Sequence, residues 1–304
     1  MVKLLSILAT IGALLGNAVV SCASAESNSG RRTFVLPQKN ANHVNTNAAL
    51  SIRGGGQFED IAKKAYYVLM ASQGLPTALA PEKTGDILFN GAFTVEEDSL
   101  SSFLVGYAGS SFIGCLYMAM LAFSTSMDAA TIIAHGTYPC ALMSIKNLLQ
   151  DNFVKHGFRK GAGLLMTLAT VGLPVAIRSG KYDSNALATA DVLFPLVCGI
   201  IGFFDRSLAM KLSGHQTGDF GDDEKTKAFS GWYFSALLTW AIVATSLLNG
   251  VEPNKAVGYS ALFLLVDLLD KRYFRKSNSI LNIDDAPLYV FYLVLGGISW
   301  SLLG

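Results

Sequence analysis

Hydrophobic residues gather in long runs that short polar segments separate. Eight of these runs approach or reach the length of about 20 residues that a membrane-spanning helix needs. They are Ala65–Ala80, Ser101–Phe123, Ala129–Leu149, Gly161–Ile177, Leu187–Phe204, Phe229–Leu248, Ala256–Leu269 and Pro287–Leu303. The first run is short and is interrupted by Gln73 and Pro76, and the seventh is also short. The pattern predicts an all-α fold, a polytopic membrane helix bundle of about eight transmembrane helices.

Composition agrees with a membrane protein. The chain has 304 residues, of which 51% are hydrophobic and 15% charged, with a net charge of +1. Soluble domains carry about 25% charged residues. Binding to nucleic acid requires a clustered basic excess, which the balanced charge excludes. The lipid bilayer is therefore the expected partner, and the sequence identifies no solute.

The N-terminal segment has the features of a targeting sequence. Residues 1–25 contain Lys3, an apolar core over 4–20 and the cleavage pattern Ala23-Ser24-Ala25, which predict a secretory signal peptide. A retained anchor helix is the alternative. Residues 26–60 follow as a predicted disordered basic tail, because 27–57 contain no acidic residue and have the composition of a transit peptide.

The leader resembles those of a particular group of preproteins. A signal peptide, an acid-free tail and the motif LSIRGGG at 50–56 are similar to the leaders of diatom and other stramenopile preproteins. In that group, plastid import usually requires an aromatic residue directly after the cleavage site, where this chain has Glu26. We expect a membrane of the secretory pathway or the cell surface, and the plastid membrane of a secondary-plastid alga is the alternative.

The distribution of basic residues favours an even number of spans. With eight spans, the loops and span ends of one side hold thirteen Lys and Arg residues, and those of the other side hold three, Arg178, Lys181 and Lys255. The basic side is cytosolic by the positive-inside rule. A cleaved signal peptide leaves the new N-terminus in the lumen, so eight spans predict that both termini are luminal.

The two halves of the membrane region resemble each other. Leu148, Phe153 and Lys155 recur as Leu269, Phe274 and Lys276, each 121 residues later. We predict a tandem 4+4 repeat, with one four-helix module over 61–180 and a second over 181–304.

This alignment places Asp267 opposite Lys146. An ionised residue inside a span needs a partner. Two pairings are open: Asp267 with Lys146 across the halves, or Asp267 with Lys271 one helical turn away.

Two other ionisable residues lie inside predicted spans. Asp191 lies about one turn inside the fifth span, where it is either a proton or cation site or a carboxylate that favours the start of the helix. His135 is the only histidine inside a span, and it is either part of a gated pathway or a hydrogen-bonding residue between helices. No second ligand at metal spacing accompanies it, so we predict no metal site.

Prolines and small residues mark further features of the spans. Four prolines, Pro76, Pro139, Pro174 and Pro195, predict helix breaks. Gly106, Ser110 and Gly114 form a small-residue stripe that predicts close helix packing, either within the chain or between copies in a homo-oligomer. Cys115, Cys140 and Cys198 lie in apolar runs and are predicted to be buried free thiols.

Three function classes follow. The first is a transporter or channel for a small solute or ion, which should gather His135, Asp191 and the prolines around one cavity. The second is a non-catalytic scaffold, which should have a filled interior and an outward-facing Gly106–Ser110–Gly114 stripe. The third is a magnesium-dependent enzyme resembling membrane prenyltransferases, suggested by two pairs, Asn147 with Asp151 and Asp267 with Asp270. Both pairs lack the full acidic cluster of that family, and no catalytic residue or cofactor is predicted.

Overall fold

The chain is all-helical over the residues that the structure describes. This computed structural model describes residues 55–220 and 223–304, in which no strand occurs. The predicted signal peptide and most of the predicted tail lie outside the described residues. The eight long helices are α2 (Gly55–Leu79), α4 (Leu100–Ser124), α5 (Ala129–Leu149), α7 (Lys160–Ser179), α8 (Ser184–Phe204), α10 (Glu224–Leu248), α11 (Pro253–Tyr273) and α13 (Asp285–Leu303). Shorter helices are η2 (Pro81–Lys83), α3 (Thr84–Phe89), α6 (Asn152–Lys155), α9 (Arg206–Leu212) and α12 (Ser277–Ile280).

Polar caps define where the long helices begin. The side chains of Ser99, Asp128 and Asp223 accept hydrogen bonds from backbone N–H groups of the first turns of α4, α5 and α10. Asp183 caps α8 in the same way. These oxygens satisfy donors that the first turn of a helix leaves without an intrahelical partner. Four of the eight long helices are therefore preceded by a residue whose side chain caps the first turn.

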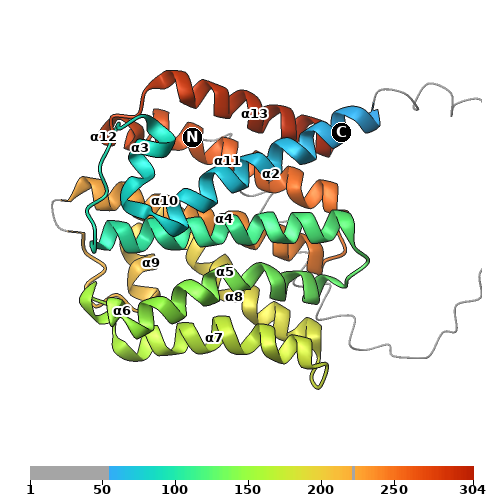
Figure 1. Cartoon of the computed structure of the whole chain (residues 1–304), viewed down its shortest axis with the longest axis horizontal. Coiled ribbons are helices and arrows are strands. Elements are labelled where there is room, and N and C mark those ends of the chain that lie inside the picture. Colours follow the sequence, from blue (N-terminus) through green and yellow to red (C-terminus); the bar gives the residue numbers. More distant parts are fainter. Residues whose placement is uncertain (1–54, 221–222) are drawn as a thin grey trace, which may run out of the picture. The chain divides into compact units, whose positions relative to one another are not determined.

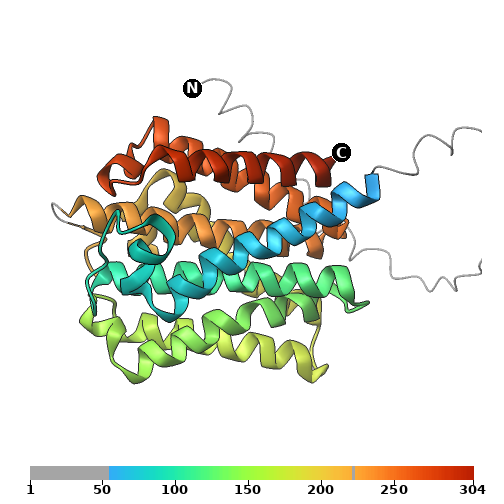
Figure 2. The same ribbon diagram turned by 45° about the horizontal axis from the view of Figure 1, so that its top comes forward.

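Two helices form the centre of the bundle. Helix α4 packs against α2, α5 and α10, and α10 packs against α4, α8 and α11. Figure 1 shows α4 and α10 across the middle of the stack, between α13 at the top and α7 at the bottom. In Figure 2, α2 lies obliquely over α4. Among the outer helices, α7 also packs against α8, and α13 packs against α2.

The outer helices present apolar side chains to the surroundings. Four described helices, α4, α7, α8 and α10, are long and apolar enough to span a membrane. In α7 only 22% of the most apolar stretch is buried inside the bundle. Its exposed residues include Leu164, Leu165, Leu168 and Val175. Water does not favour a surface of this kind, whereas lipid does, so the bundle is compatible with a membrane protein.

The predicted runs coincide with the eight long helices, and the differences, such as Ala80 beyond the end of α2, are at the ends. Helix α2 begins at Gly55, ten residues before the predicted run, so its first turns include residues 55–60 that were assigned to the tail. Glu59 stabilises this extension because it pairs with Lys63 at 2.9 Å and accepts a hydrogen bond from Asn254 on α11. Helix α11 likewise extends beyond its apolar run, to Tyr273.

The small-residue stripe of α4 faces the interior. Gly106 lies against Met143 of α5, and a Cβ atom at Gly114 would overlap the carbonyl oxygen of Gly136 and the indole of Trp240. The missing side chain at Gly114 therefore lets α4, α5 and α10 approach one another closely. The outward-facing stripe expected for a scaffold is not found.

Replacing Gly114 tests this close approach. We expect Gly114→Ala to lower the free energy of unfolding by about 1–3 kcal/mol, because the methyl group overpacks the junction of three helices. The matched control is Gly172→Ala on α7, where a Cβ atom meets nothing within 4 Å. The control should be neutral or stabilising by up to about 1 kcal/mol, the difference in helix propensity. Thermal unfolding midpoints in detergent compare the two variants, and equal midpoints would contradict this packing.

Candidate functional site

Asp191 is a buried carboxylate without a cationic partner. It lies on α8 and is only 7% exposed. The hydroxyl of Thr137 on α5 donates a hydrogen bond to its Oδ2 at 2.6 Å. Among the ion pairs between described residues, none involves Asp191. A carboxylate in such surroundings requires either a proton or an external cation.

A cavity of about 350 Å³ adjoins Asp191. Its walls come from α4, α5, α7, α8 and α10, with Ser213 and Leu212 at the end of α9, and most of its lining is apolar. Its hydroxyl groups belong to Tyr107, Ser111, Thr137, Thr170 and Ser213, and its aromatic rings to Tyr107, Phe194 and Trp240. The indole N–H of Trp240 donates to the carbonyl of Gly136 at 3.1 Å, which fixes this ring in the wall.

Two prolines remove backbone donors from the helices that line this cavity. A proline has no N–H and cannot donate to the carbonyl four residues earlier. Pro195 therefore frees the carbonyl of Asp191, and Pro174 frees that of Thr170, and both Asp191 and Thr170 line the cavity. The predicted helix breaks themselves are not found. Helices continue through Pro76, Pro139, Pro174 and Pro195, since packing by neighbouring helices holds a proline-containing helix together.

His135 does not share the cavity of Asp191. It is half-buried, its ring packs edge-on against Tyr138 at a centroid distance of 5.4 Å, and it lines a separate cavity of about 400 Å³ with Pro139 and Lys146. The α5 residue that reaches Asp191 is Thr137. Positions two apart on a helix point in nearly opposite directions, about 200° apart, so Thr137 and His135 cannot face one cavity. The meeting of His135 with Asp191 expected for a transporter is therefore not found.

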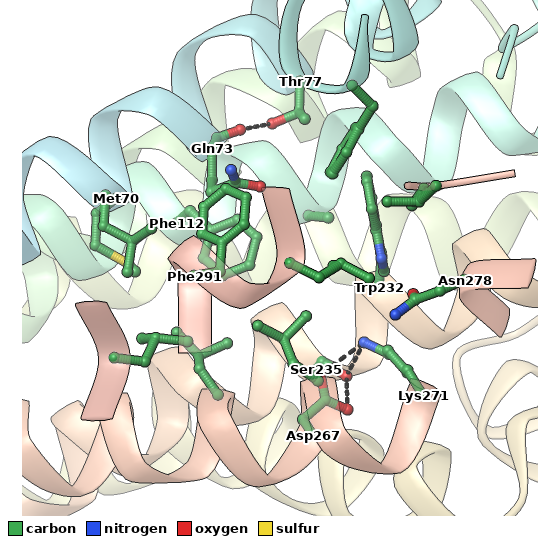
Figure 3. A pocket seen from close by; sticks show the side chains of 18 residues that line it. Met70, Gln73, Thr77, Phe112, Trp232, Ser235, Asp267, Lys271, Asn278 and Phe291 are labelled. Carbon is green, nitrogen blue, oxygen red and sulfur yellow. Dashed lines mark hydrogen bonds and ion pairs between the residues drawn. The ribbon is translucent and has the colours of Figure 1, made fainter. Parts of the chain in front are cut away.

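Asp267 pairs with Lys271 on its own helix. The ammonium of Lys271 lies 2.6 Å from Oδ2 of Asp267 and donates to Oγ of Ser235 at 2.8 Å. Ser235, from α10, donates to Oδ1 of Asp267 at 2.8 Å. Figure 3 shows this closed triangle of side chains below Trp232. The pairing with Lys146 is not found, because Lys146 is exposed at the end of α5.

The triangle changes the interpretation of Lys271. The charge count of the loops included this lysine, but the structure buries it within α11, at 3% exposure. A second cavity of about 70 Å³ adjoins the triangle. Most of its walls are apolar, and Gln73, Asn278 and Trp232 reach it from other elements (Figure 3).

Neither acidic pair that suggested an enzyme forms an open metal site. In the pair of Asp267 and Asp270, each carboxylate is paired with a cation of the chain. Asp270 accepts a hydrogen bond from Nε of Arg275 at 2.5 Å. Asp151 is exposed, whereas Asn147 is buried and accepts a hydrogen bond from Asn152. In residues 55–220 and 223–304, no group of three or more His, Cys, Asp or Glu side chains could hold a metal ion. Cys115 and Cys198 are buried and Cys140 half-buried, all as free thiols.

Arg206 and Asp98 are among the charged groups outside the long helices whose pKa values are shifted. Burial lowers the pKa of Arg206 on α9 to about 10, and the nearby Arg275 acts in the same direction. Arg206 remains protonated at neutral pH and donates to the carbonyl of Lys227 at 2.7 Å. The pKa of Asp98 lies below its ordinary value because it bonds to Lys155, at 2.6 Å.

The sequence pointed to Asp191 and Asp267 but not to the residues that hold them. Thr137 and Ser235 are ordinary components of apolar helices, where such hydroxyls usually bond to their own backbone. Asn278 and Gln73 lie in polar or interrupted segments, where an amide side chain is common and does not indicate a site. No local pattern marks these four residues, because their neighbours come from distant parts of the chain.

Removing one member of the buried pair tests its role. We expect Lys271→Met to destabilise the protein by about 3–5 kcal/mol, because it leaves Asp267 buried without a cation. The double variant Asp267→Asn with Lys271→Met should recover most of this loss. The control Lys155→Met breaks an exposed pair and should leave the unfolding midpoint nearly unchanged. A double variant no more stable than Lys271→Met would contradict the pairing.

Comparison with known protein families, with curated proteins and with solved structures found no match to this chain. Its function is therefore inferred from the geometry and chemistry of the site alone.

Proposed function

We propose that the chain is an integral membrane protein that binds and carries a small organic cation, and that Asp191 is the counter-ion of this solute. One observation carries the proposal: Asp191 is buried beside a cavity of about 350 Å³ and has no cationic partner among the described residues. Other buried carboxylates of the bundle, Asp267 and Asp270, do have such partners.

The groups around Asp191 suit a positive charge. The carboxylate offers one oxygen beyond that bonded to Thr137, and the freed carbonyls of residues 170 and 191 are further acceptors. Charge interactions are strong where water is excluded, so a bound cation would offset the cost of burying the carboxylate. A transporter commonly places such a carboxylate between helices that proline interrupts or weakens.

The size and walls of the cavity favour an organic cation over a bare metal ion. A hydrated metal site requires several polar ligands, whereas most of this lining is apolar. Phe194 and Trp240 provide aromatic faces, which attract ammonium groups by about 0.5–2 kcal/mol each. The cavity has room for a solute of several heavy atoms, in which an ammonium group faces Asp191 and an alkyl part faces the rings.

We further propose that all eight long helices span the membrane as a tandem of two four-helix modules. Matching helix lengths support this arrangement. Helices α4, α5, α6 and α7 have 25, 21, 4 and 20 residues, and α10, α11, α12 and α13 have 25, 21, 4 and 19. The caps Ser99 and Asp223 are 124 residues apart, and the left-handed residues Asp151 and Lys276 are 125 apart.

The helix lengths and caps support a register that differs by three residues from the one predicted from the sequence. At a spacing of 124, Asp267 falls opposite Met143, whereas the spacing of 121 placed it opposite Lys146. The helix contacts repeat in the same order, since α2, α4, α5 and α7 correspond to α8, α10, α11 and α13. We propose the secretory route and luminal termini on the basis of the leader and the basic loops, with a plastid membrane as the alternative.

Asp191→Asn tests the counter-ion. We expect the purified protein in liposomes to bind and take up choline, and the variant to bind it more than about 100-fold more weakly, since removal of the partner of a buried charge costs about 3–5 kcal/mol. The neutral isostere 3,3-dimethylbutanol should bind with equal affinity to the parent and to Asp191→Asn. Asp128→Asn, at an exposed cap, is the matched control. Equal choline affinity in parent and Asp191→Asn would refute the proposal.

Cysteine labelling tests the number of spans. With eight spans, Met127 and Lys155 lie on opposite sides of the membrane because α5 separates them. With only α4, α7, α8 and α10 spanning, they lie on the same side. Met127→Cys and Lys155→Cys in sealed vesicles should therefore react oppositely with an impermeant maleimide. The parent chain is the control for its own cysteines, and labelling of both variants from the same side would exclude eight spans.

A further inference from the structure

The cavity beside Lys271 contains unused hydrogen-bond donors. Asn278 on α12 is buried, at 5% exposure, and its Nδ2 has no partner. The Nε2 of Gln73 on α2 is also buried and unpartnered. Both residues line the cavity of about 70 Å³. Buried amide donors are rarely left unsatisfied, so the cavity lacks an acceptor.

The triangle does not provide this acceptor. The oxygens of Asp267 accept hydrogen bonds from Ser235 and Lys271, and neither oxygen is bonded to the amide of Asn278 or Gln73. The ammonium of Lys271 has three N–H groups, of which Asp267 and Ser235 accept two. The third N–H group of Lys271 has no acceptor among the described residues. In Figure 3 the nitrogens of Lys271, Asn278 and Trp232 face the same part of the cavity, whereas Gln73, on α2, lines another part of its wall.

The local charge is positive. Arg206 and Arg275 lie close enough to repel the charge of Lys271, and these three cations are balanced by only two buried carboxylates, Asp267 and Asp270. Glu224, which also attracts Arg206, is largely exposed to solvent and is screened. An anion in the cavity would therefore reduce the net charge of the cluster.

The dimensions limit the size of this anion. A buried water needs at least about 10–15 Å³ of such volume, so 70 Å³ admits a few atoms and excludes an organic solute. Apolar walls, among them Phe112 and Phe291, surround the donors. Such walls suit a weakly hydrated monovalent ion better than phosphate or sulfate, whose oxygens would need more donors.

We propose that this cavity binds a small monovalent anion of the chloride class, held by Lys271, Asn278 and Trp232. The site is separate from the cation cavity of Asp191. The cavity, its donors and the local charge support this anion site. The proposal does not depend on the proposed transport function.

Halide dependence of the parent protein is the first test. The unfolding midpoint is measured in sodium chloride and in sodium gluconate at equal ionic strength, because gluconate is too large for the cavity. We expect chloride and bromide to raise the midpoint saturably, and gluconate not to do so. Equal midpoints in chloride and gluconate would overturn the proposal and would mean that the cavity holds only water.

Variants of Asn278 test whether the halide effect on the unfolding midpoint arises at this cavity. Asn278→Leu removes the donor, and Asn278→Asp keeps the shape but replaces the donor by a negative charge. In both, the chloride concentration at half-effect should rise at least about tenfold, as the loss of a hydrogen bond to a charged group predicts. Asn147→Leu is the matched control, because Asn147 is also a buried amide with an unpartnered Nδ2 but lies outside this cavity. An unchanged half-effect in both Asn278 variants would overturn the assignment.

Trp232 provides a direct optical readout. The variant Trp240→Phe with Trp300→Phe leaves Trp232 as the single tryptophan of the chain. Iodide should quench its fluorescence saturably, chloride should compete with iodide, and Asn278→Asp should abolish the saturable part. Linear quenching that Asn278→Asp does not change would overturn the proposal. Asp191→Asn should leave the halide effect intact, so failure of the cation proposal is distinguishable from failure of this one.

Discussion

The interior of this bundle must satisfy its own polar groups, because burial between the helices removes them from water and an unpaired buried polar group is costly. Most hydroxyl side chains solve this problem locally. Ser110, Ser111 and Thr239 each donate to the carbonyl four residues earlier on the same helix. These groups require nothing from neighbouring helices. The polar groups that cannot be satisfied in this way are therefore the ones that carry information about function.

The buried charges divide into two kinds under this constraint. Asp267 and Asp270 have cations from the same segment of chain, Lys271 and Arg275. Within each pair the two charges neutralise each other, and the pairs stabilise the end of α11. Asp191 has a single hydroxyl donor and a cavity. This contrast supports the proposal that Asp191 has an external partner, because no cationic side chain among the described residues neutralises it.

The sequence predicted the helices well because the apolar runs and their caps are local signals. It predicted the start of α2 poorly, because residues 55–64 are polar and are stabilised by Glu59 through a contact to α11, which no local pattern contains. It also overstated the effect of prolines, since tertiary packing holds the helices together around them. The helical spacing of Asp267 and Lys271 favoured the correct pairing, whereas the competing pairing with Lys146 depended on a comparison of the two halves and is not found, because Lys146 is exposed at the end of α5.

The cavities beside Asp191 and Lys271 could not be predicted from the sequence, because each depends on side chains from at least five helices. Their positions nevertheless follow the proposed repeat. Ser111 lines the cavity of Asp191, and Ser235, 124 residues later, lines the cavity of Lys271; Cys140 and Leu264 stand in the same relation. If the modules share an origin, two matching spaces beside α4 and α10 have acquired opposite chemistry. The cavity beside Asp191 has a carboxylate without a cation, and the cavity beside Lys271 has an ammonium group and amide donors without acceptors. A cation site and an anion site would then be the two outcomes of one packing arrangement.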